Sequence, residues 1–105
     1  MDNFLRFLSL TKKSGHLIEG YNNSLGVMNK KKIHLVIVSK ELSSNSEKKF
    51  TNYCEAKNII KIKAYSKEEL GKALGRQEVK IVCITDENLA KKLISLAKEA
   101  TQTKS

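Results

Sequence analysis

The chain has 105 residues, 40% of them hydrophobic, which is enough for one domain with a single core and too few for two ordinary domains. Twenty Lys and Arg residues against eleven Asp and Glu give a net charge of +9, which favours a polyanionic partner such as RNA, DNA or an anionic membrane surface. The longest apolar run, Leu35–Val38, is far shorter than the roughly 18 residues that cross a bilayer, and the N-terminus lacks the pattern of a secretory signal. We therefore expect a cytoplasmic protein without a membrane segment.

The first third of the chain alternates between helical and extended patterns. A helical stripe of apolar residues begins at Phe4 and stops at Ser14-Gly15. The short segment 16–18 is expected to be extended and to end at Gly20. From Tyr21 the apolar spacing is helical again, and the expected helix runs to the lysine run Lys30–Lys32.

The remaining two thirds continue the alternation. Segments 33–39, 59–64 and 79–85 are rich in β-branched residues and are predicted to be strands. Two S-x-x-E patterns, at Ser44–Glu47 and Ser66–Glu69, predict capping boxes at helix starts, and Asp86 is expected to cap the last helix. Helices that alternate with strands predict a three-layer α/β/α sandwich, with one domain over residues 1–100 and a frayed polar tail over 101–105.

No residue cluster in the sequence indicates catalysis or metal binding. Cys54 and Cys83 lie far apart and without neighbouring histidines, whereas a structural zinc site needs about four ligands at close spacing. A reactive cysteine needs a lowered pKa, typically at a helix N-terminus, but Cys54 is predicted in mid-helix and Cys83 inside a strand. We expect no enzyme activity, no metal and no cofactor. A small phosphocarrier using Cys54 or His16 ranks last among the hypotheses.

The most informative stretch is 12–32, because it combines a glycine, two amides and many cations. Gly20 precedes a predicted helix whose first turn carries Asn22 and Asn23, and asparagine amides can read base edges that a lysine cannot. The free N–H groups of that turn suit a phosphate, and Lys12, Lys13 and the run 30–32 flank it. Equally, an asparagine could serve only as an N-cap, and the lysines 30–32 could form a solvated face at the helix end.

Three segments in this order resemble the L7Ae/L30e family of ribosomal proteins. They are F-L-x-L-x-K-K-S-G-x-L-x-x-G at 7–20, K-I-H-L-V-I-V-S at 32–39 and E-E-L-G-K-A-L-G at 68–75. Cys54-Glu55 and the run I-T-D-E at 84–87 are further matching landmarks, so the resemblance covers nearly the whole chain. It implies an α/β/α sandwich around a central mixed sheet that binds structured RNA, typically a kink-turn or a related bent helix–internal-loop–helix.

In the family, a G-T-N-E segment contacts tandem sheared G·A pairs, and its positions here are Gly20, Tyr21, Asn22 and Asn23. Gly20 and Asn22 agree with the segment. Tyr21 and Asn23 differ, a family lysine falls at Gly26, and the family's apolar loop before the last strand is polar here, from Arg76 to Val79. The resemblance thus leaves open which structured RNA is bound. Tyr21 could stack on an unpaired base or belong to the core.

Our leading hypothesis is a monomeric, non-enzymatic protein that binds ribosomal or other structured RNA, with the ribosome as a candidate partner. The alternative is a protein-interaction module of the ribosome or translation machinery whose RNA contacts are non-specific. The residues expected to contact RNA are Lys12, Lys13, Gly20, Tyr21, Asn22, Asn23, Lys30, Lys31, Arg76 and Gln77, with Lys32 beside them.

Overall fold

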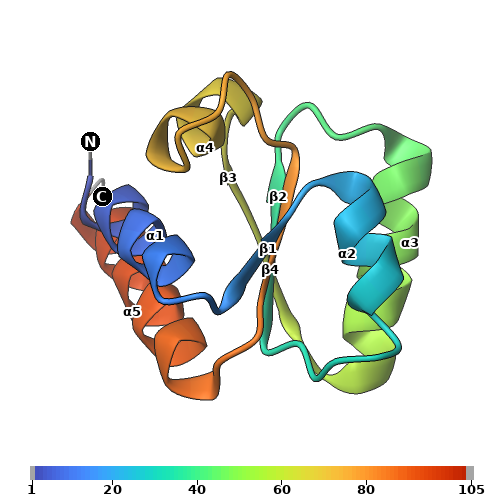
Figure 1. Cartoon of the computed structure of the whole chain (residues 1–105). Helices are drawn as coiled ribbons and strands as arrows, with labels where there is room; N and C mark the ends of the chain where they lie inside the picture. Colours follow the sequence, from blue (N-terminus) through green and yellow to red (C-terminus); the bar gives the residue numbers. More distant parts are fainter. Residues whose placement is uncertain (1, 104–105) are drawn as a thin grey trace.

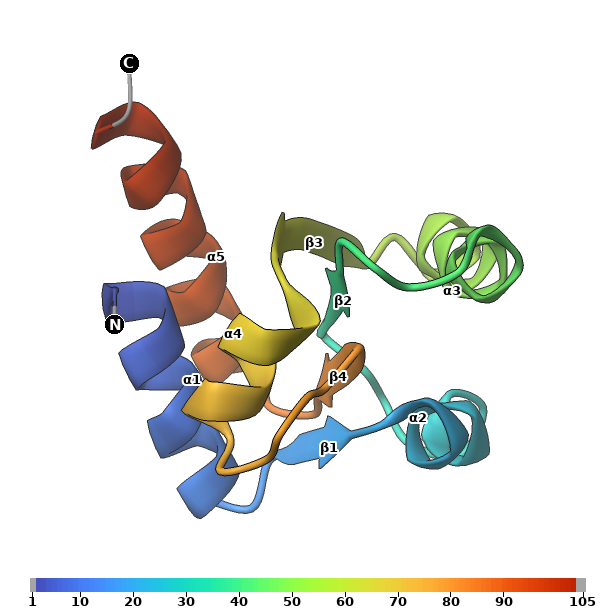
Figure 2. The same ribbon diagram turned by 90° about the horizontal axis from the view of Figure 1, so that it is seen from above.

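The protein is an α/β/α sandwich, as the sequence predicts (Figures 1 and 2). The computed structural model describes residues 2–103, and the side chains of residues 2–100. The elements in chain order are α1 (Asn3–Lys13), β1 (Leu17–Glu19), α2 (Tyr21–Val27), β2 (Leu35–Ser39), α3 (Ser44–Lys57), β3 (Ile60–Tyr65), α4 (Lys67–Ala73), β4 (Ile81–Ile84) and α5 (Glu87–Thr103).

The sheet is mixed, with the strand order β1-β4-β2-β3. β4 pairs antiparallel with both β1 and β2, whereas β3 pairs parallel with β2 and forms one edge of the sheet. Helices α1, α4 and α5 cover one face, and α2 and α3 cover the other (Figure 2). Because β1 is the opposite edge strand, helix α2 starts at that edge of the sheet.

Alternating side chains of the central strands build two cores, one on each face. In β2, Leu35 and Ile37 pack under α1, α4 and α5, while Val36 and Val38 pack under α2 and α3. All four are fully buried, which is why segment 33–39 is a nearly continuous apolar run and does not alternate with polar residues. The thiols of Cys54 and Cys83 belong to the core under α2 and α3, as the sequence predicts.

Helix caps follow the sequence signals in two of three places. Ser66 and Glu69 form the predicted capping box of α4, and Asp86 Oδ2 accepts a hydrogen bond from the backbone N–H of Leu89 (2.8 Å). The capping box predicted at Ser44–Glu47 is wrong by one residue, since Ser43 is the N-cap of α3 and accepts from the Ser46 N–H. The Glu47 carboxylate is then free to accept from two lysines of β3.

The bounds of two helices differ from the expectation. Helix α2 ends at Val27, and the Val27 carbonyl then accepts turn hydrogen bonds from the N–H groups of Lys30 and Lys31. Gly26 and Asn29 are weak helix formers, so the helix stops before the lysine run. At the C-terminus, α5 continues to Thr103, while residues 104–105 of the expected tail lie outside the described residues. None of the helices within residues 2–103 is long and apolar enough to cross a membrane.

Candidate nucleic-acid interface

Gly20 makes the turn from β1 into α2. Its backbone has φ 95° and ψ 153°, a conformation that residues with a Cβ rarely adopt. The Gly20 N–H donates to the Ile81 carbonyl (2.9 Å), which extends the β1–β4 pairing, and its own carbonyl accepts from the Ser24 N–H (3.0 Å). Gly20 is therefore both the end of the strand pairing and the N-cap residue of α2.

The two asparagines differ in their surroundings. The Asn23 side chain donates from Nδ2 to the Glu19 carbonyl (3.1 Å), which anchors it to the end of β1. The Asn22 side chain is exposed and makes no hydrogen bond to any other described residue. Neither amide caps the helix, because Gly20 occupies the N-cap position without a side-chain bond. The N-cap interpretation of these asparagines is therefore wrong, and the Asn22 amide is available to a ligand.

Glu19 joins two of the predicted cations beside this turn. Its Oε1 accepts hydrogen bonds from Lys12 Nζ (3.1 Å) and Arg76 Nε (2.7 Å), and Lys12 Nζ also donates to the Leu74 carbonyl (2.6 Å). The Glu19 side chain is 15% exposed, and its Oε2 is buried with no partner among the described residues. Sequence reasoning missed Glu19, although a lone carboxylate directly before Gly20 in a basic stretch was a usable signal.

The loop between α4 and β4 brings Arg76 to Glu19. The Arg76 N–H donates to the Gly71 carbonyl (2.8 Å), and α4 approaches the loop so closely that a Cβ at Gly71 would lie 2.7 Å from the Cα of Glu78. Arg76 reaches Glu19 through Nε, so its two terminal Nη groups are not used by that bond, and its side chain is 61% exposed. Gln77 follows it and is exposed as well.

Tyr21 is half-buried and packs into the core under α2 and α3. Its ring meets the Phe50 ring edge-on, with 5.8 Å between centroids and 72° between planes. This supports the core interpretation of Tyr21, and we assign its ring no part in stacking on a base. Lys13 is exposed at the end of α1, one residue beyond the anchored Lys12.

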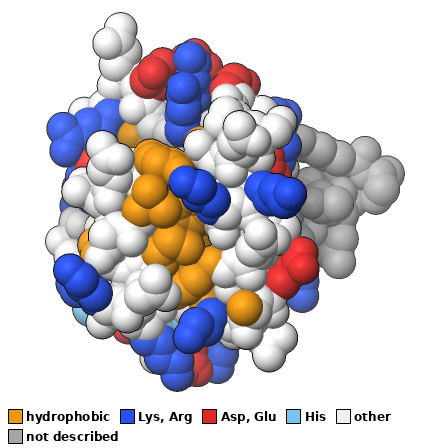
Figure 3. All heavy atoms as spheres, turned by 90° about the vertical axis from the view of Figure 1, so that its right-hand side faces the viewer, with side chains coloured by type: hydrophobic (Ala, Val, Ile, Leu, Met, Phe, Trp, Pro, Cys, Tyr) orange, Lys and Arg blue, Asp and Glu red, His pale blue; other side chains and the backbone are white. Residues whose placement is uncertain are grey.

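The lysines 30–32 lie at the other end of α2, away from Asn22. They line a hollow of about 350 Å³ together with Tyr53 and Lys57 of α3. In Figure 3, which shows the face formed by α2 and α3, Lys and Arg side chains surround a stripe of apolar side chains. The structure therefore divides the predicted site in two: Lys12, Arg76 and Asn22 at one end of α2, and the lysine run at the other.

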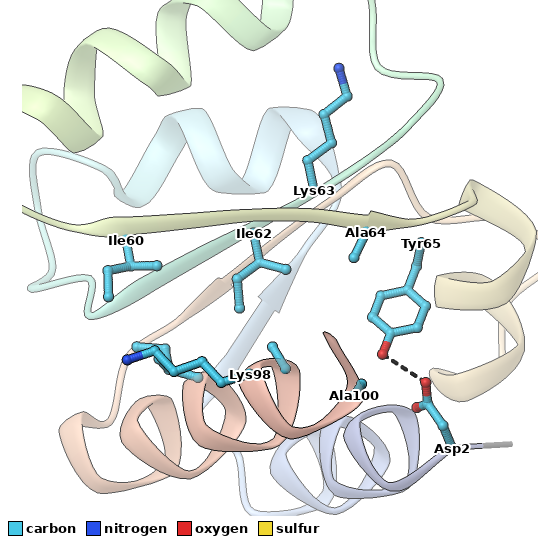
Figure 4. A pocket seen from close by; sticks show the side chains of 10 residues that line it. Asp2, Ile60, Ile62, Lys63, Ala64, Tyr65, Lys98 and Ala100 are labelled. Carbon is cyan, nitrogen blue, oxygen red and sulfur yellow. Dashed lines mark hydrogen bonds between the residues drawn. The ribbon is translucent and has the colours of Figure 1, made fainter. Parts of the chain in front are cut away.

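A larger hollow of about 500 Å³ lies between the edge strand β3 and α5 (Figure 4). Its walls are mostly apolar, and Ile60 of β3 is 48% exposed there. At one end the Tyr65 hydroxyl donates to Asp2 Oδ2 (2.7 Å), and burial together with this carboxylate raises the tyrosine's pKa. We refer to this hollow as the β3–α5 groove; none of the residues predicted to contact RNA lines it.

The two thiols are poorly suited to nucleophilic chemistry. Burial raises the pKa of Cys54 to about 11. Burial also raises the pKa of Cys83, although the nearby Ser24 hydroxyl counteracts part of this effect. Both thiols are therefore protonated at neutral pH, whereas a reactive cysteine is a thiolate. Over the described part of the chain, no group of three or more His, Cys, Asp and Glu residues is placed to hold a metal ion.

Comparison with known proteins defines the class of this fold. Residues 2–95 match the model of the ribosomal protein L7Ae/L30e/S12e/Gadd45 family, so the chain belongs to that family. Among individual relatives, it is 29% identical over 89 residues to the RNA-binding protein YlxQ of Bacillus subtilis (strain 168), covering 85% of this chain and 89% of YlxQ.

Solved structures show the same fold. A Bacillus halodurans protein described as having unknown function superposes with a TM-score of 0.86 at 23% identity, over 91% of this chain and 97% of that one. The Giardia lamblia 15.5 kD RNA binding protein superposes with a TM-score of 0.72 at 20% identity, over 87% of this chain and 81% of that one.

Proposed function

We propose that this protein is a monomeric, non-enzymatic RNA-binding protein of the cytoplasm that holds a structured RNA at the N-terminal end of α2. The observation that carries the proposal is the exposed Asn22 amide, unbonded among the described residues, beside the cations Lys12 and Arg76. The amide can pair with a base edge and the cations can neutralise phosphates, which together distinguish a specific interface from a merely basic surface.

We infer the type of RNA from the shape of this interface and from the family resemblance. A side chain as short as Asn22, next to the tight turn at Gly20, can reach a base edge only where the RNA groove is opened. An internal loop with non-canonical pairs offers such an edge, while a regular A-form helix hides it in a deep, narrow groove. We therefore propose a bent helix–internal-loop–helix of the kink-turn type, in ribosomal or other RNA. The relative named an RNA-binding protein supports the RNA part of this proposal.

The test compares two asparagines at matched helix positions. Asn22 is the second residue of α2 and Asn88 the second residue of α5, and both side chains are exposed. We expect Asn22→Ala to weaken binding of a helix–internal-loop–helix RNA by about 1–3 kcal/mol, and Asn88→Ala to leave it unchanged. Fluorescence anisotropy titrations with this RNA and with a straight duplex measure the affinities of the two variants. Equal affinity of wild type and Asn22→Ala, with both folded, would remove Asn22 from the interface.

The β3–α5 groove favours a second candidate function, a protein-interaction module of the translation machinery. An apolar groove beside an edge strand that pairs on one side only with another described strand is a surface on which a partner protein can dock. If this function dominates, ribosome-associated proteins stay bound to the chain after nuclease treatment and no longer bind the Ile60→Asp variant. Loss of all partners on nuclease treatment, with no effect of Ile60→Asp, favours RNA binding.

A further inference from the structure

The hollow at the C-terminal end of α2 combines an apolar floor with an excess of positive charge. Met28, Ile33 and Ile59 contribute apolar surface, and Lys30–Lys32 and Lys57 contribute the cations. None of the described residues that line it is an Asp or a Glu. Its volume of about 350 Å³ lies at the small end of the range for ligand pockets, which is about 300–1,000 Å³. We refer to it as the lysine pocket.

The lysines of this pocket differ from the cations that Glu19 and Glu47 hold. Lys12 and Arg76 share the carboxylate of Glu19, and two lysines of β3 share that of Glu47. None of the four pocket lysines forms an ion pair with a described residue. Their charge is therefore uncompensated within a concave surface, and such a surface concentrates positive potential for an anion.

Tyr53 provides an aromatic surface in the same pocket. Like Tyr21, it packs partly against the core under α2 and α3, but unlike Tyr21 it also lines this hollow. Burial raises the pKa of its hydroxyl, which stays a neutral hydrogen-bond donor. An aromatic ring beside cations is the combination with which proteins bind single-stranded nucleic acid, since bases stack on the ring and phosphates meet the lysines.

We propose that the lysine pocket binds one unpaired nucleotide of the RNA, with its base against Tyr53 and the apolar floor and its phosphates against the lysines. The inference deepens the proposed function and rests on it, because it adds a second contact for the same RNA. Helix α2 has seven residues and so spans only about 10 Å, which lets one RNA contact both of its ends.

A purely structural role for these lysines makes a different prediction. Lys57 lies in the last turn of α3, and the lysine run follows the end of α2, where cations complement the negative end of a helix dipole. In that case their removal lowers thermal stability and leaves RNA affinity unchanged.

The experiment titrates the protein with the single-stranded hexanucleotide U6 and with an abasic oligomer of the same length, at about 50 mM salt, following amide shifts by NMR. We expect U6 to shift residues of the lysine pocket and to bind more tightly than the abasic oligomer. Tyr53→Leu should weaken U6 binding roughly 5- to 150-fold, whereas Tyr53→Phe should retain it, because stacking needs the ring and not the hydroxyl. Equal affinity for the abasic oligomer, or no binding of U6, would overturn the proposal.

A charge-matched control separates this pocket from general attraction. Lys30→Gln/Lys31→Gln and Lys92→Gln/Lys98→Gln each remove two exposed cations, but the second pair lies on α5, across the sheet from the pocket. We expect only the first pair to weaken U6 binding, and to reduce the slope of log affinity against log salt by roughly 0.7 for each phosphate that is no longer neutralised. Equal weakening by both pairs would overturn the proposal.

A last experiment distinguishes failure of the lysine pocket from failure of the proposed RNA interface at Asn22. A bent RNA with blunt ends is compared with the same RNA carrying a U6 extension. If both sites hold, Asn22→Ala weakens both RNAs, while Lys30→Gln/Lys31→Gln removes the extra affinity that the extension confers. If only the pocket holds, U6 binding stays sensitive to Tyr53→Leu and Asn22→Ala has no effect. An extension that adds no affinity overturns the proposal and leaves the Asn22 interface standing.

Discussion

The two ends of α2 carry positive charge in opposite ways. At the N-terminal end, the Glu19 carboxylate fixes Lys12 and Arg76 and offsets part of their charge. At the C-terminal end, no carboxylate among the described residues pairs with the lysine run. A fixed cation favours one geometry of the bound phosphate, whereas a free cation attracts any phosphate nearby. If RNA binds at both ends as proposed, we expect the first end to govern discrimination between RNAs and the second to govern overall affinity.

The largest effect on the N-terminal end of α2 is expected from a substitution at Gly20. Gly20→Ala places a Cβ on a backbone with φ 95°, although the nearest atom to that Cβ, Asn23 Nδ2, is 4.0 Å away. The cost is therefore backbone strain rather than a clash, and we expect the free energy of unfolding to fall by about 1–3 kcal/mol. Because the turn also sets the direction of Asn22, affinity for the bent RNA should fall as well.

Gly26 near the other end of α2 is the matched control. It has an ordinary helical backbone, and apart from its chain neighbours and its own helix backbone no described heavy atom lies within 4 Å of an added Cβ. Gly26→Ala should therefore raise the free energy of unfolding by about 0.5–1 kcal/mol. Urea unfolding of both variants, together with RNA anisotropy, tests the contrast. A neutral Gly20→Ala would show that the turn tolerates side chains and does not fix the interface.

The next prediction concerns the carboxylate that fixes the cations. Glu19→Gln replaces two charge-assisted hydrogen bonds with weaker ones. Because the Lys12 and Arg76 side chains are partly exposed, we expect the free energy of unfolding to fall by only about 1 kcal/mol. Removing a negative charge should tighten binding to a straight duplex, while the looser Lys12 and Arg76 should bind the bent RNA less selectively. The ratio of the two affinities, measured by anisotropy, should therefore shrink.

Glu99→Gln on α5 provides the control for net charge. Glu99 is exposed, lies on the other side of the sheet from α2, and forms no ion pair with another described residue. Glu99→Gln should tighten duplex binding slightly and leave unchanged both the free energy of unfolding and the ratio of bent to straight RNA affinities. If Glu99→Gln and Glu19→Gln change the ratio alike, the carboxylate at residue 19 acts only through its charge.

The sequence predicted the fold well because its signals are local. The apolar run at 33–39, the Ser66–Glu69 box and Asp86 each act over a few residues, and the structure contains all three. The resemblance added the mixed sheet, which periodicity alone does not specify. The capping box at Ser44–Glu47 misled because Ser43 has the same capping chemistry one residue earlier, and Glu47 has stronger partners in β3.

The candidate site was harder to predict because its parts meet only in three dimensions. Arg76 reaches Glu19 across 57 positions of sequence, a pairing that no local pattern indicates. The lysine run is near Asn22 in sequence, but the whole of α2 separates them in space. Tyr53 and Lys57 join that run only because α3 lies beside α2 on one face of the sheet. Proximity along the chain was therefore a poor guide to which cations act together.

The smallest expected effect comes from Glu47, a second carboxylate that fixes two cations, but away from α2. Hydrogen bonds from Lys61 and Lys63 hold the pKa of Glu47 below its ordinary value of 4.5. Because the carboxylate form is favoured in the folded state, its stabilisation is complete above the unfolded pKa and is lost as the pH falls through the lower, folded pKa. The free energy of unfolding by urea should therefore fall from pH 7 to pH 3, and less so in Glu47→Gln.

Glu55→Gln, an exposed position on the same helix, is the control for this pH dependence. It should retain the full loss of stability between pH 7 and pH 3, since its carboxylate has no ion-pair partner among the described residues. Glu47→Gln should also leave the ratio of bent to straight RNA affinities unchanged, because its lysines lie on β3 and not at α2. If Glu47→Gln alters that ratio as Glu19→Gln does, selectivity does not reside in the cations fixed at the N-terminal end of α2. The two ends of the helix would then differ only in how tightly their cations are held.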